Sequence, residues 1–277
     1  MGLRDRGIEI KTREQIISMR AAGLVVGRTL EVLREAVRPG ISTGELDAIA
    51  EDHIRSAGAV PSFKGYHGFT GSICTSVNEE IVHGIPGGRI LAAGDLISID
   101  CGAIVDGWHG DAAITVPVGP VKDFDPKLLE LATVCEDAMW KGFAAAKLGG
   151  RLTDISAAIE EHVRAKSSYG IVTDFVGHGI GSAMHQPPNV PNYGKPGRGP
   201  KLVEGMALAV EPMLTLGRQD NHTLADDWTV VTDDGLPAAH TEHTFTLTPQ
   251  GPWILTALDG GEARLAELGT RCGALAD

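Results

Sequence analysis

The stretch that most constrains the fold is residues 96–115, LISIDCGAIVDGWHGDAAIT. Asp106-Gly107 interrupts it with a dipeptide that favours the two-residue turn of a β-hairpin. Taking these two residues as the turn fixes how the flanking strands pair. Because side chains alternate between the two faces of a strand, Asp100 and Asp111 then lie on the same face.

Two carboxylates within apolar strands need an explanation. In this register Asp100 and Asp111 are diagonal neighbours, with Cα atoms roughly 7–8 Å apart. Gly102 and Ala113 lie opposite them and leave open volume. Two acids in such half-buried surroundings raise each other's pKa, and a bound cation would relieve the repulsion. From the hairpin alone, an exposed strand with two ordinary acids is an equally good interpretation.

Three further residues extend the pattern beyond the hairpin. Glu211 ends the apolar run of MALAVEPML, Glu242 alternates with His240 in AAHTEHTFTLT, and His178 lies between glycines in GHGIG. A mostly carboxylate shell with one imidazole favours Mn, Fe, Co or Zn in a pair of shared sites. The residues alone therefore predict a hydrolase that uses two metals. We expect His240 and His243 to have at most a supporting role behind the ligands.

The order of expected elements repeats along the chain. Two helices followed by strands occur twice, and GISTGELDAIAEDHIR at 40–55 can be laid on GGRLTDISAAIEEHVR at 149–164. This pattern predicts an α+β fold in one domain, 1–277, with pseudo-symmetric halves about 12–118 and 126–250 and a site between them. The expected helices are 12–37, 43–57, 126–147 and 153–168, the expected strands are 74–77, 207–211, 228–232 and 239–248, and 185–201 is expected to be a loop.

Composition excludes several classes of protein. A net charge of −12 argues against general binding to nucleic acid, including DNA, and against an anionic membrane surface. No segment approaches the roughly 18 apolar residues of a membrane span, and residues 1–15 lack the apolar run of a signal peptide. The four cysteines are far apart and form no C-x-x-C pair. These features predict a reduced, cytoplasmic protein.

Five segments, taken in order, resemble the bacterial type I methionine aminopeptidases, which have the pita-bread fold. The resemblance covers about residues 10 to 255. It rests on VNEEIVHGIP at 77–86, DLISIDCGAIVDGWHGDAAIT at 95–115, GHGIGSAMHQPPNVPNY at 177–193, AVEPM at 209–213 and HTEHT at 240–244. It implies removal of the N-terminal methionine from nascent proteins and peptides whose second residue is small. Attack on the first peptide bond would come from a water or hydroxide bridging two divalent metals.

The resemblance also assigns residues to roles. The implied ligands of two divalent ions (Co, Mn, Fe, Zn or Ni) are Asp100, Asp111, His178, Glu211 and Glu242. Glu211 would also handle the proton of the attacking water. His185 would contact the scissile carbonyl oxygen, and His83 would lie near the amine and the peptide nitrogen as a proton donor to the leaving group.

An apolar pocket for the methionine side chain is the least specific part of the resemblance. Its positions are occupied by Phe63, Tyr66, Phe69, Cys74 and Trp228, each of which could equally be a core residue. Met184 stands where relatives often carry an aromatic residue, which would alter the shape of the pocket. His109, between the two hairpin acids, is expected to face away from the metals and to be structural.

Other functions of the same fold stay open at this point. Xaa-Pro aminopeptidase or prolidase-like activity is the main alternative, and a metal-free pita-bread binding protein is another. The expected partners are peptide and nascent-protein N-termini. The basic residues Lys195, Arg198 and Lys201 form a loop that could contact the ribosome, although a solvated loop explains them as well. Nothing in the sequence demands more than a monomer.

Overall fold

The computed structural model describes residues 7–275, so the outermost residues of the expected domain and of the segment inspected for a signal peptide lie outside the described residues. Within that range the helices are α1 (Arg13–Ala36), α2 (Thr43–Ser56), α3 (Pro126–Ala145), α4 (Leu152–Lys166) and α5 (Glu262–Glu267), with 3-10 turns at Tyr66–Gly68 and Val121–Asp123. None of these helices combines the length and hydropathy of a membrane span. The four long helices lie within two residues of the ranges expected from the sequence.

Local sequence explains where the first two helices begin. At the start of α1, Thr12 accepts a hydrogen bond from the Gln15 backbone while the Gln15 side chain accepts one from the Thr12 backbone. Ser42 and Glu45 repeat this capping box at the start of α2. Such a pair satisfies two backbone N–H groups that the first helical turn leaves without partners.

The strands form one large sheet and two small ones. The strands are β1 (Val60–Pro61), β2 (Ile73–Val77), β3 (Glu80–Val82), β4 (Leu96–Val105), β5 (Trp108–Pro117), β6 (Gly170–Ile171), β7 (Gly177–Gly179), β8 (Gln186–Val190), β9 (Ala207–Val210), β10 (Met213–Thr215), β11 (Asn221–Thr223), β12 (Val230–Thr232), β13 (Ala238–His240), β14 (Glu242–Thr248) and β15 (Gly251–Ile254). Within residues 7–275 the large sheet has nine strands and the order β1-β4-β5-β14-β9-β7-β8, with β2 beside β4 and β15 beside β14. The two central strands, β5 and β14, come from the two expected halves of the chain.

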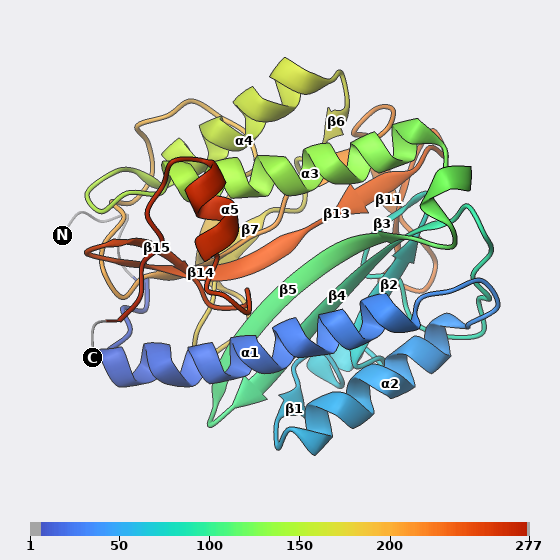
Figure 1. Cartoon of the computed structure of the whole chain (residues 1–277), viewed down its shortest axis with the longest axis horizontal. Coiled ribbons are helices and arrows are strands. Elements are labelled where there is room, and N and C mark those ends of the chain that lie inside the picture. The colour runs from blue at the N-terminus through green and yellow to red at the C-terminus, as the bar shows by residue number, and fades with distance from the viewer. Residues whose placement is uncertain (1–6, 276–277) are drawn as a thin grey trace.

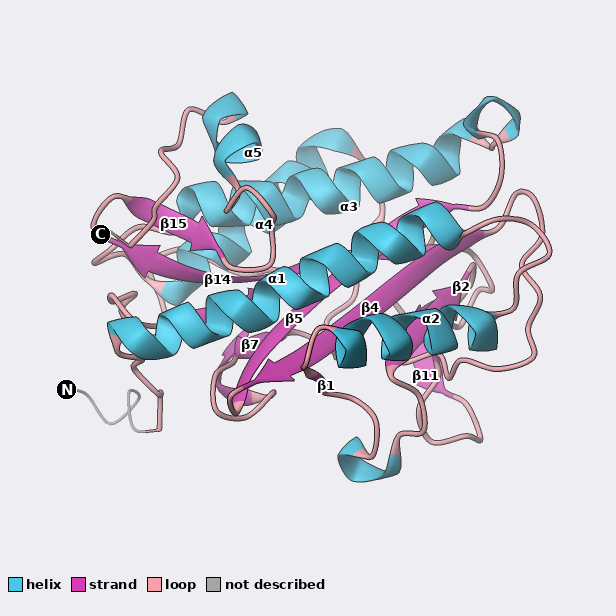
Figure 2. Ribbon diagram, turned by 60° about the horizontal axis from the view of Figure 1, so that its bottom comes forward, coloured by secondary structure: helices cyan, strands magenta, loops and turns pink. Residues whose placement is uncertain are grey.

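Both helix pairs cover the same face of the large sheet. Figure 1 shows α1 with α2 on one side and α3 with α4 on the other, with β5 and β14 visible between the two pairs. Figure 2, in which the molecule is turned by 60° from the view of Figure 1, shows α1 lying across β4 and β5. Buried residues of α1 and α2 pack on the apolar face of the hairpin, which carries Ile97, Ile99, Cys101 and Ala112. The opposite face of the hairpin, with Asp100 and Asp111, is therefore turned away from the helices.

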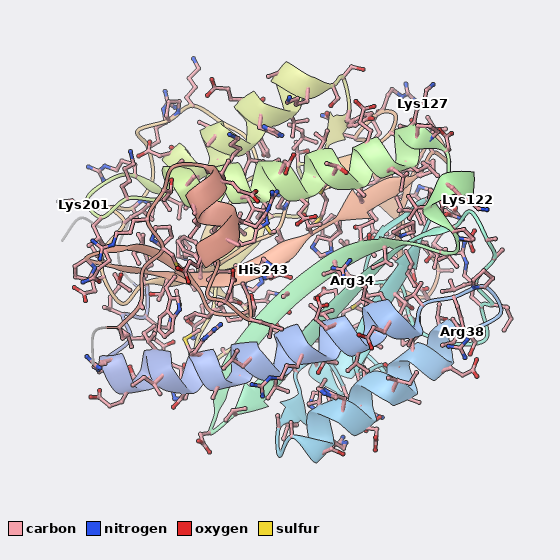
Figure 3. All side chains as sticks on the ribbon, viewed as in Figure 1. Arg34, Arg38, Lys122, Lys127, Lys201 and His243 are labelled. Carbon is pink, nitrogen blue, oxygen red and sulfur yellow. The ribbon has the colours of Figure 1, made fainter. Side chains whose placement is uncertain are left out.

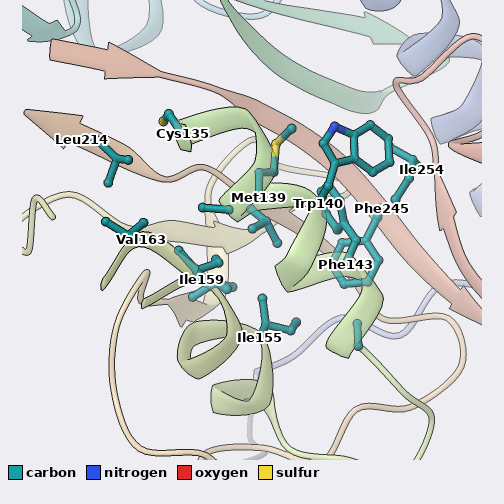
Figure 4. Packing of buried hydrophobic residues seen from close by; sticks show 14 of the residues in the cluster. Cys135, Met139, Trp140, Phe143, Ile155, Ile159, Val163, Leu214, Phe245 and Ile254 are labelled. Atoms are coloured by element: carbon teal, nitrogen blue, oxygen red, sulfur yellow. The ribbon is translucent and has the colours of Figure 1, made fainter. Parts of the chain in front are cut away.

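The second helix pair has its own core. Trp140 and Phe143 of α3, Ile155 and Ile159 of α4, and Phe245 of β14 belong to one buried cluster (Figure 4). Fully burying an aliphatic or aromatic side chain of this size stabilises the fold by about 1.5–3 kcal/mol. Each pair of long helices thus anchors one half of the sheet, and the seam between β5 and β14 runs between the two cores.

Two expectations about strands were wrong. Residues 185–201 were expected to be a loop, yet β8 occupies part of this segment and pairs with β7 at the edge of the sheet. Prolines lack an N–H donor, so they are tolerated on an edge strand, where one side needs no partner. The single strand expected at 239–248 is two strands, because Thr241 separates β13 from β14.

Candidate metal centre and active site

The hairpin has the register expected from its turn. Asp100 pairs with Ala113, and Gly102 pairs with Asp111. On the other side of β5, Ala113 pairs with Glu242 of β14. Asp100, Ala113 and Glu242 therefore form a row across three strands, with Asp111 one step along the strand between them. Because the side chain of Ala113 is small, the carboxylates of Asp100 and Glu242 on either side of it can approach each other.

Two more strands bring Glu211 and His178 to the same place. His243 of β14 pairs with Val210 of β9, which puts Glu211 directly after β9 at the level of Glu242. His178 is the central residue of β7, and its Nε2 lies 3.5 Å from Glu211 Oε1 and 3.9 Å from Glu242 Oε1. All five residues expected to bind metal line one pocket of about 590 Å³.

The carboxylates in this pocket have no cationic partner. Asp111 and Glu242 are only 3% and 2% exposed, and no lysine or arginine lines the pocket among the described residues. Burial raises the pKa of Asp100 to about 7 and that of Glu211 to about 8. Burial, reinforced by the neighbouring acids, also raises the pKa values of Asp111 and Glu242 well above their usual range. Such a cluster is costly as anions unless a positive charge is bound.

Unpaired oxygen atoms show that metal ions fit this cluster. Asp100 Oδ1, Asp111 Oδ1 and Glu242 Oε1 are buried without a hydrogen-bond partner anywhere in residues 7–275. His178 Nδ1 lies 3.0 Å from the carbonyl oxygen of Gly179. If Nδ1 carries the proton and donates it to this oxygen, Nε2 keeps its lone pair toward the acids, as in histidines that bind metals.

Two further histidines stand at the mouth of the cluster. The ring of His185 lies 4.3 Å from that of His178, and its Nδ1 is 2.9 Å from the Tyr66 hydroxyl. His83 has φ of 61°, a left-handed conformation that is uncommon outside glycine and recurs at functional sites. Burial lowers the pKa of His83 to about 4 and also lowers that of His185. Both imidazoles are therefore neutral near pH 7.

The five expected pocket residues form one apolar cluster. Phe63, Phe69 and Cys74 are buried together with Met184, and Tyr66 and Trp228 pack against them. The rings of Phe69 and Trp228 meet edge to face at 5.0 Å. This cluster forms one wall of the pocket that contains the acids. Met184 is 3% exposed, lines the same pocket and immediately precedes His185 in the chain.

His109 lies on a different face than expected. It does pair with Ile104, but it is two residues from Asp111 and so points to the same side of β5. Its Nδ1 lies 3.0 Å from Ser62 Oγ, and the space above Gly102 is filled by that same serine and by Phe63. The expectation that it faces away from the acids was wrong, because alternation carries residues two apart to one face.

Sequence reasoning underestimated or missed other residues of the pocket. Phe175 was missed: it lies at the end of a short loop, where no periodicity signals burial, and its ring meets that of His83 at 5.6 Å. His240 was expected to have only a supporting role, yet its Nε2 lies 3.5 Å from Glu211 Oε2. Its alternation with Glu242 was the available signal.

Comparison with known proteins agrees with a metal-dependent peptidase site. Residues 18–249 match Metallopeptidase family M24. The chain is 52% identical to the methionine aminopeptidase of Clostridium acetobutylicum over 90% of this chain and 98% of that one, and 53% identical to methionine aminopeptidase 1 of Bacillus subtilis over 89% and 98%.

Solved structures support the assignment of the fold. The methionine aminopeptidase of Rickettsia prowazekii superposes with a TM-score of 0.87 at 40% identity, covering 90% of this chain and 99% of that one. The prolidase of Pyrococcus furiosus, at 23% identity and a TM-score of 0.72 over 92% of this chain and 66% of that one, shares the pita-bread fold alone. The chain therefore belongs to metallopeptidase family M24 and, within it, to the methionine aminopeptidases.

Proposed function

We propose that the protein removes the N-terminal methionine from peptides and nascent proteins whose second residue is small. The observation that carries this proposal is a cluster of four carboxylates, two buried and two half-buried, next to an apolar wall in a pocket that no described lysine or arginine lines. A protonated α-amine would be attracted to the acidic end, and a flexible thioether side chain would suit the apolar wall. An internal peptide bond has no such amine, which explains a preference for chain ends.

The metal centre in this proposal has two divalent cations, drawn from Co, Mn, Fe, Zn and Ni. Asp100, Asp111, His178, Glu211 and Glu242 would hold them, with Asp111 and Glu242 shared between the two. Cations bound there would lower the pKa of a water and offset negative charge that develops on the peptide carbonyl oxygen.

The protein's own side chains would move the protons. Glu211 lies at the edge of the cluster, with its side chain 12% exposed, and would accept a proton from the attacking water. The Tyr66 hydroxyl would donate to His185 Nδ1, which leaves the proton on Nε2 to hydrogen-bond the carbonyl oxygen. His83, held between Phe175 and Trp228, would donate a hydrogen bond from its ring N–H to the leaving nitrogen.

Hydrolysis of Met-Ala-Ser tests the proposal directly. We expect methionine release that requires added Mn or Co and that falls sharply when alanine is replaced by a bulky second residue. An Xaa-Pro tripeptide without methionine is the matched comparison. Folded protein that releases no methionine with any of the five metals would refute the proposed activity, and faster cleavage of the Xaa-Pro peptide would replace it with a prolidase-like one.

We further propose a cytoplasmic, monomeric enzyme with one catalytic domain, built from halves about 12–118 and 126–250. The order of strands supports the two halves, since β4-β5 and β9-β14 meet symmetrically at the seam. An isolated β-bridge also occurs at the same place in each half. The residue before α2, Ser42, pairs with Ile90, and the residue before α4, Arg151, pairs with Lys201. All four cysteines are free, as the reducing cytoplasm requires.

We also propose that the loop that carries Lys195, Arg198 and Lys201 contacts the ribosome. All three side chains are exposed. Reversing the three charges should weaken co-sedimentation with ribosomes at low salt. Reversing Arg38, Lys122 and Lys127, which lie at the opposite end of the molecule from Lys201 (Figure 3), is the matched control. Equal sedimentation of both variants and the unaltered protein would refute this contact.

A further inference from the structure

The side chain of His240 points into the acidic cluster without a hydrogen-bond partner. It is the last residue of β13 and only 2% exposed, and its Nε2 is buried and unpaired within residues 7–275. This nitrogen lies 3.5 Å from Glu211 Oε2, and the ring lines the pocket. A buried polar nitrogen left without a partner costs about 1–3 kcal/mol, so such an arrangement needs a reason.

The backbone of His240 is fixed by hydrogen bonds from the neighbouring hairpin. Thr115 Oγ1 donates to the His240 carbonyl oxygen at 2.7 Å, and the His240 N–H donates to Thr115 Oγ1 and Ser98 Oγ at 3.1 and 3.2 Å. Met213 of β10 pairs with His240 on its other side. The backbone from which the imidazole projects is therefore fixed on both sides before any ligand binds.

Five of the six side chains, all but Asp100, form two overlapping groups of possible ligands. One group is Asp111, His178 and Glu242; the other is Glu211, His240 and Glu242; within each group, one ligand atom per residue lies within 4.8 Å of the others. The two groups share Glu242, and each contains one histidine. This is the pattern expected of two adjacent cations that share a carboxylate and have one imidazole each.

We propose that His240 Nε2 is a sixth metal ligand, which binds the second cation together with Glu211 and Glu242. This inference rests on the proposed metal centre and adds a ligand to the five taken from the family resemblance. A hydrogen bond from His240 to Glu211 is the competing role. The structure contains no such bond, because the contact between the two side chains falls outside hydrogen-bond geometry.

Counting imidazoles on the bound metal tests the proposal without relying on activity. X-ray absorption spectra of the Zn-loaded protein should show on average about one imidazole per metal, and His240→Gln should halve that number. Calorimetric titration with Zn should show the weaker site losing affinity by at least about 10- to 100-fold, the range seen even for groups behind the ligands. Glutamine can still donate a hydrogen bond to Glu211, so it would rescue a role in positioning but not one in coordination.

A matched control is available three residues further along the chain, in β14. His243 is half-buried on the helix-covered side of β14, near Trp140 of α3, and its Nδ1 lies 2.8 Å from Thr256 Oγ1 (Figure 3). His243→Gln should keep the imidazole count and both affinities, and His240→Ala should repeat the loss seen with His240→Gln. Circular dichroism and a melting curve of each variant confirm that it is folded.

Two outcomes would overturn the inference, and they are distinguishable. An unchanged imidazole count and unchanged affinities in His240→Gln would refute His240 as a ligand while leaving the metal centre intact. Folded wild-type protein that binds no Zn, Mn or Co would refute the metal centre itself, and His240 with it.

Discussion

At the scale of single residues, the site depends on where each carboxylate stands in the register of the sheet. Asp111 lies between Asp100 and Glu242 and is only 3% exposed, and Ser62 and Phe63 occupy the space over Gly102 opposite it. A residue in this central position can offer one oxygen to each of two cations. An amide has only one carbonyl oxygen to offer.

Asp111→Asn is therefore expected to abolish binding of at least one metal and to lower activity by about 1000-fold or more, since the lost charge stabilisation is worth several kcal/mol. Metal content after gel filtration and release of methionine from Met-Ala-Ser are the two measurements. Asp52→Asn, at an exposed position on α2, is the control and should change neither. Full metal content with normal turnover in Asp111→Asn would contradict the bridging role.

Much of this arrangement could be predicted from sequence because hairpin register is local. The turn at Asp106-Gly107 fixes which residues face each other, so Asp100 and Asp111 could be placed on one face without other strands. The roles of Glu211 and His240 could not be derived this way. Their positions depend on pairing between strands far apart in the chain, and no local pattern specifies that pairing.

At the scale of elements, glycines allow α1 to pack closely against the sheet. The backbone of Gly23 touches that of Gly110 in β5, and a Cβ on Gly23 would come within 2.2 Å of the Leu255 carbonyl oxygen. This close approach aligns α1 with the strand that carries Asp111. A carbonyl in a hydrogen-bonded segment cannot move aside as a side-chain tip can.

Gly23→Ala should therefore destabilise the protein by about 1–3 kcal/mol through overpacking, although alanine normally favours a helix interior by about 0.5–1 kcal/mol. Gly142→Ala in α3 is the comparison, because its nearest neighbours are side-chain atoms of Ile155 and Ile159 at about 3 Å. We expect a smaller loss there in urea unfolding. Equal or greater stability of Gly23→Ala would show that α1 can shift away.

The segment before α1 holds another part of the site in place. Glu9 accepts hydrogen bonds from Ser182 Oγ at 2.7 Å and from the Ser182 N–H at 3.1 Å, and Lys11 lies 3.4 Å from the same carboxylate. Ser182 begins the turn that leads through Met184 to His185. Burial alone would raise the pKa of Glu9, but the hydrogen bonds from Ser182 outweigh it and lower the pKa to about 2.

A carboxyl with a lowered pKa in the folded state stabilises the fold above its ordinary pKa and loses that contribution as pH falls toward 2. Glu9→Gln should cost about 1 kcal/mol at pH 7, and the difference from wild type should shrink between about pH 4.5 and pH 2. Guanidinium unfolding at pH 7, 5 and 3 measures it. A difference that stays constant or grows on acidification would contradict the role of the charged carboxylate.

The helices were predicted better than the strands. The four long helices have caps and periodicity that act within the helix, so their ranges could be read locally. β8 could not, because its two prolines are typical of a loop and only its pairing with β7 makes it a strand. The break at Thr241 has the same origin, since β13 joins a small sheet while β14 joins the large one.

At the scale of the whole molecule, the metal centre lies across the seam between the two halves. Asp100 and Asp111 come from the first half, and His178, Glu211 and Glu242 come from the second. In the part of the chain that the structure describes, β5 and β14 share two register pairs, Glu242 with Ala113 and His243 with Ala112, and Thr244 Oγ1 hydrogen-bonds the Asp111 backbone. Bound cations would therefore cross-link two separately packed cores.

Removing the metals should lower the stability of the entire fold, because binding stabilises the native state by about 2.7 kcal/mol at a free metal concentration 100 times Kd. For a chain of this size that corresponds to a fall in Tm of about 5–10 °C. Melting curves with Mn and with excess chelator measure the shift. Because Asp111→Asn loses at least one metal, its two curves should lie closer together than those of the wild type. A wild-type Tm that is the same with metal and with chelator would mean that the seam is held by strand pairing and packing alone.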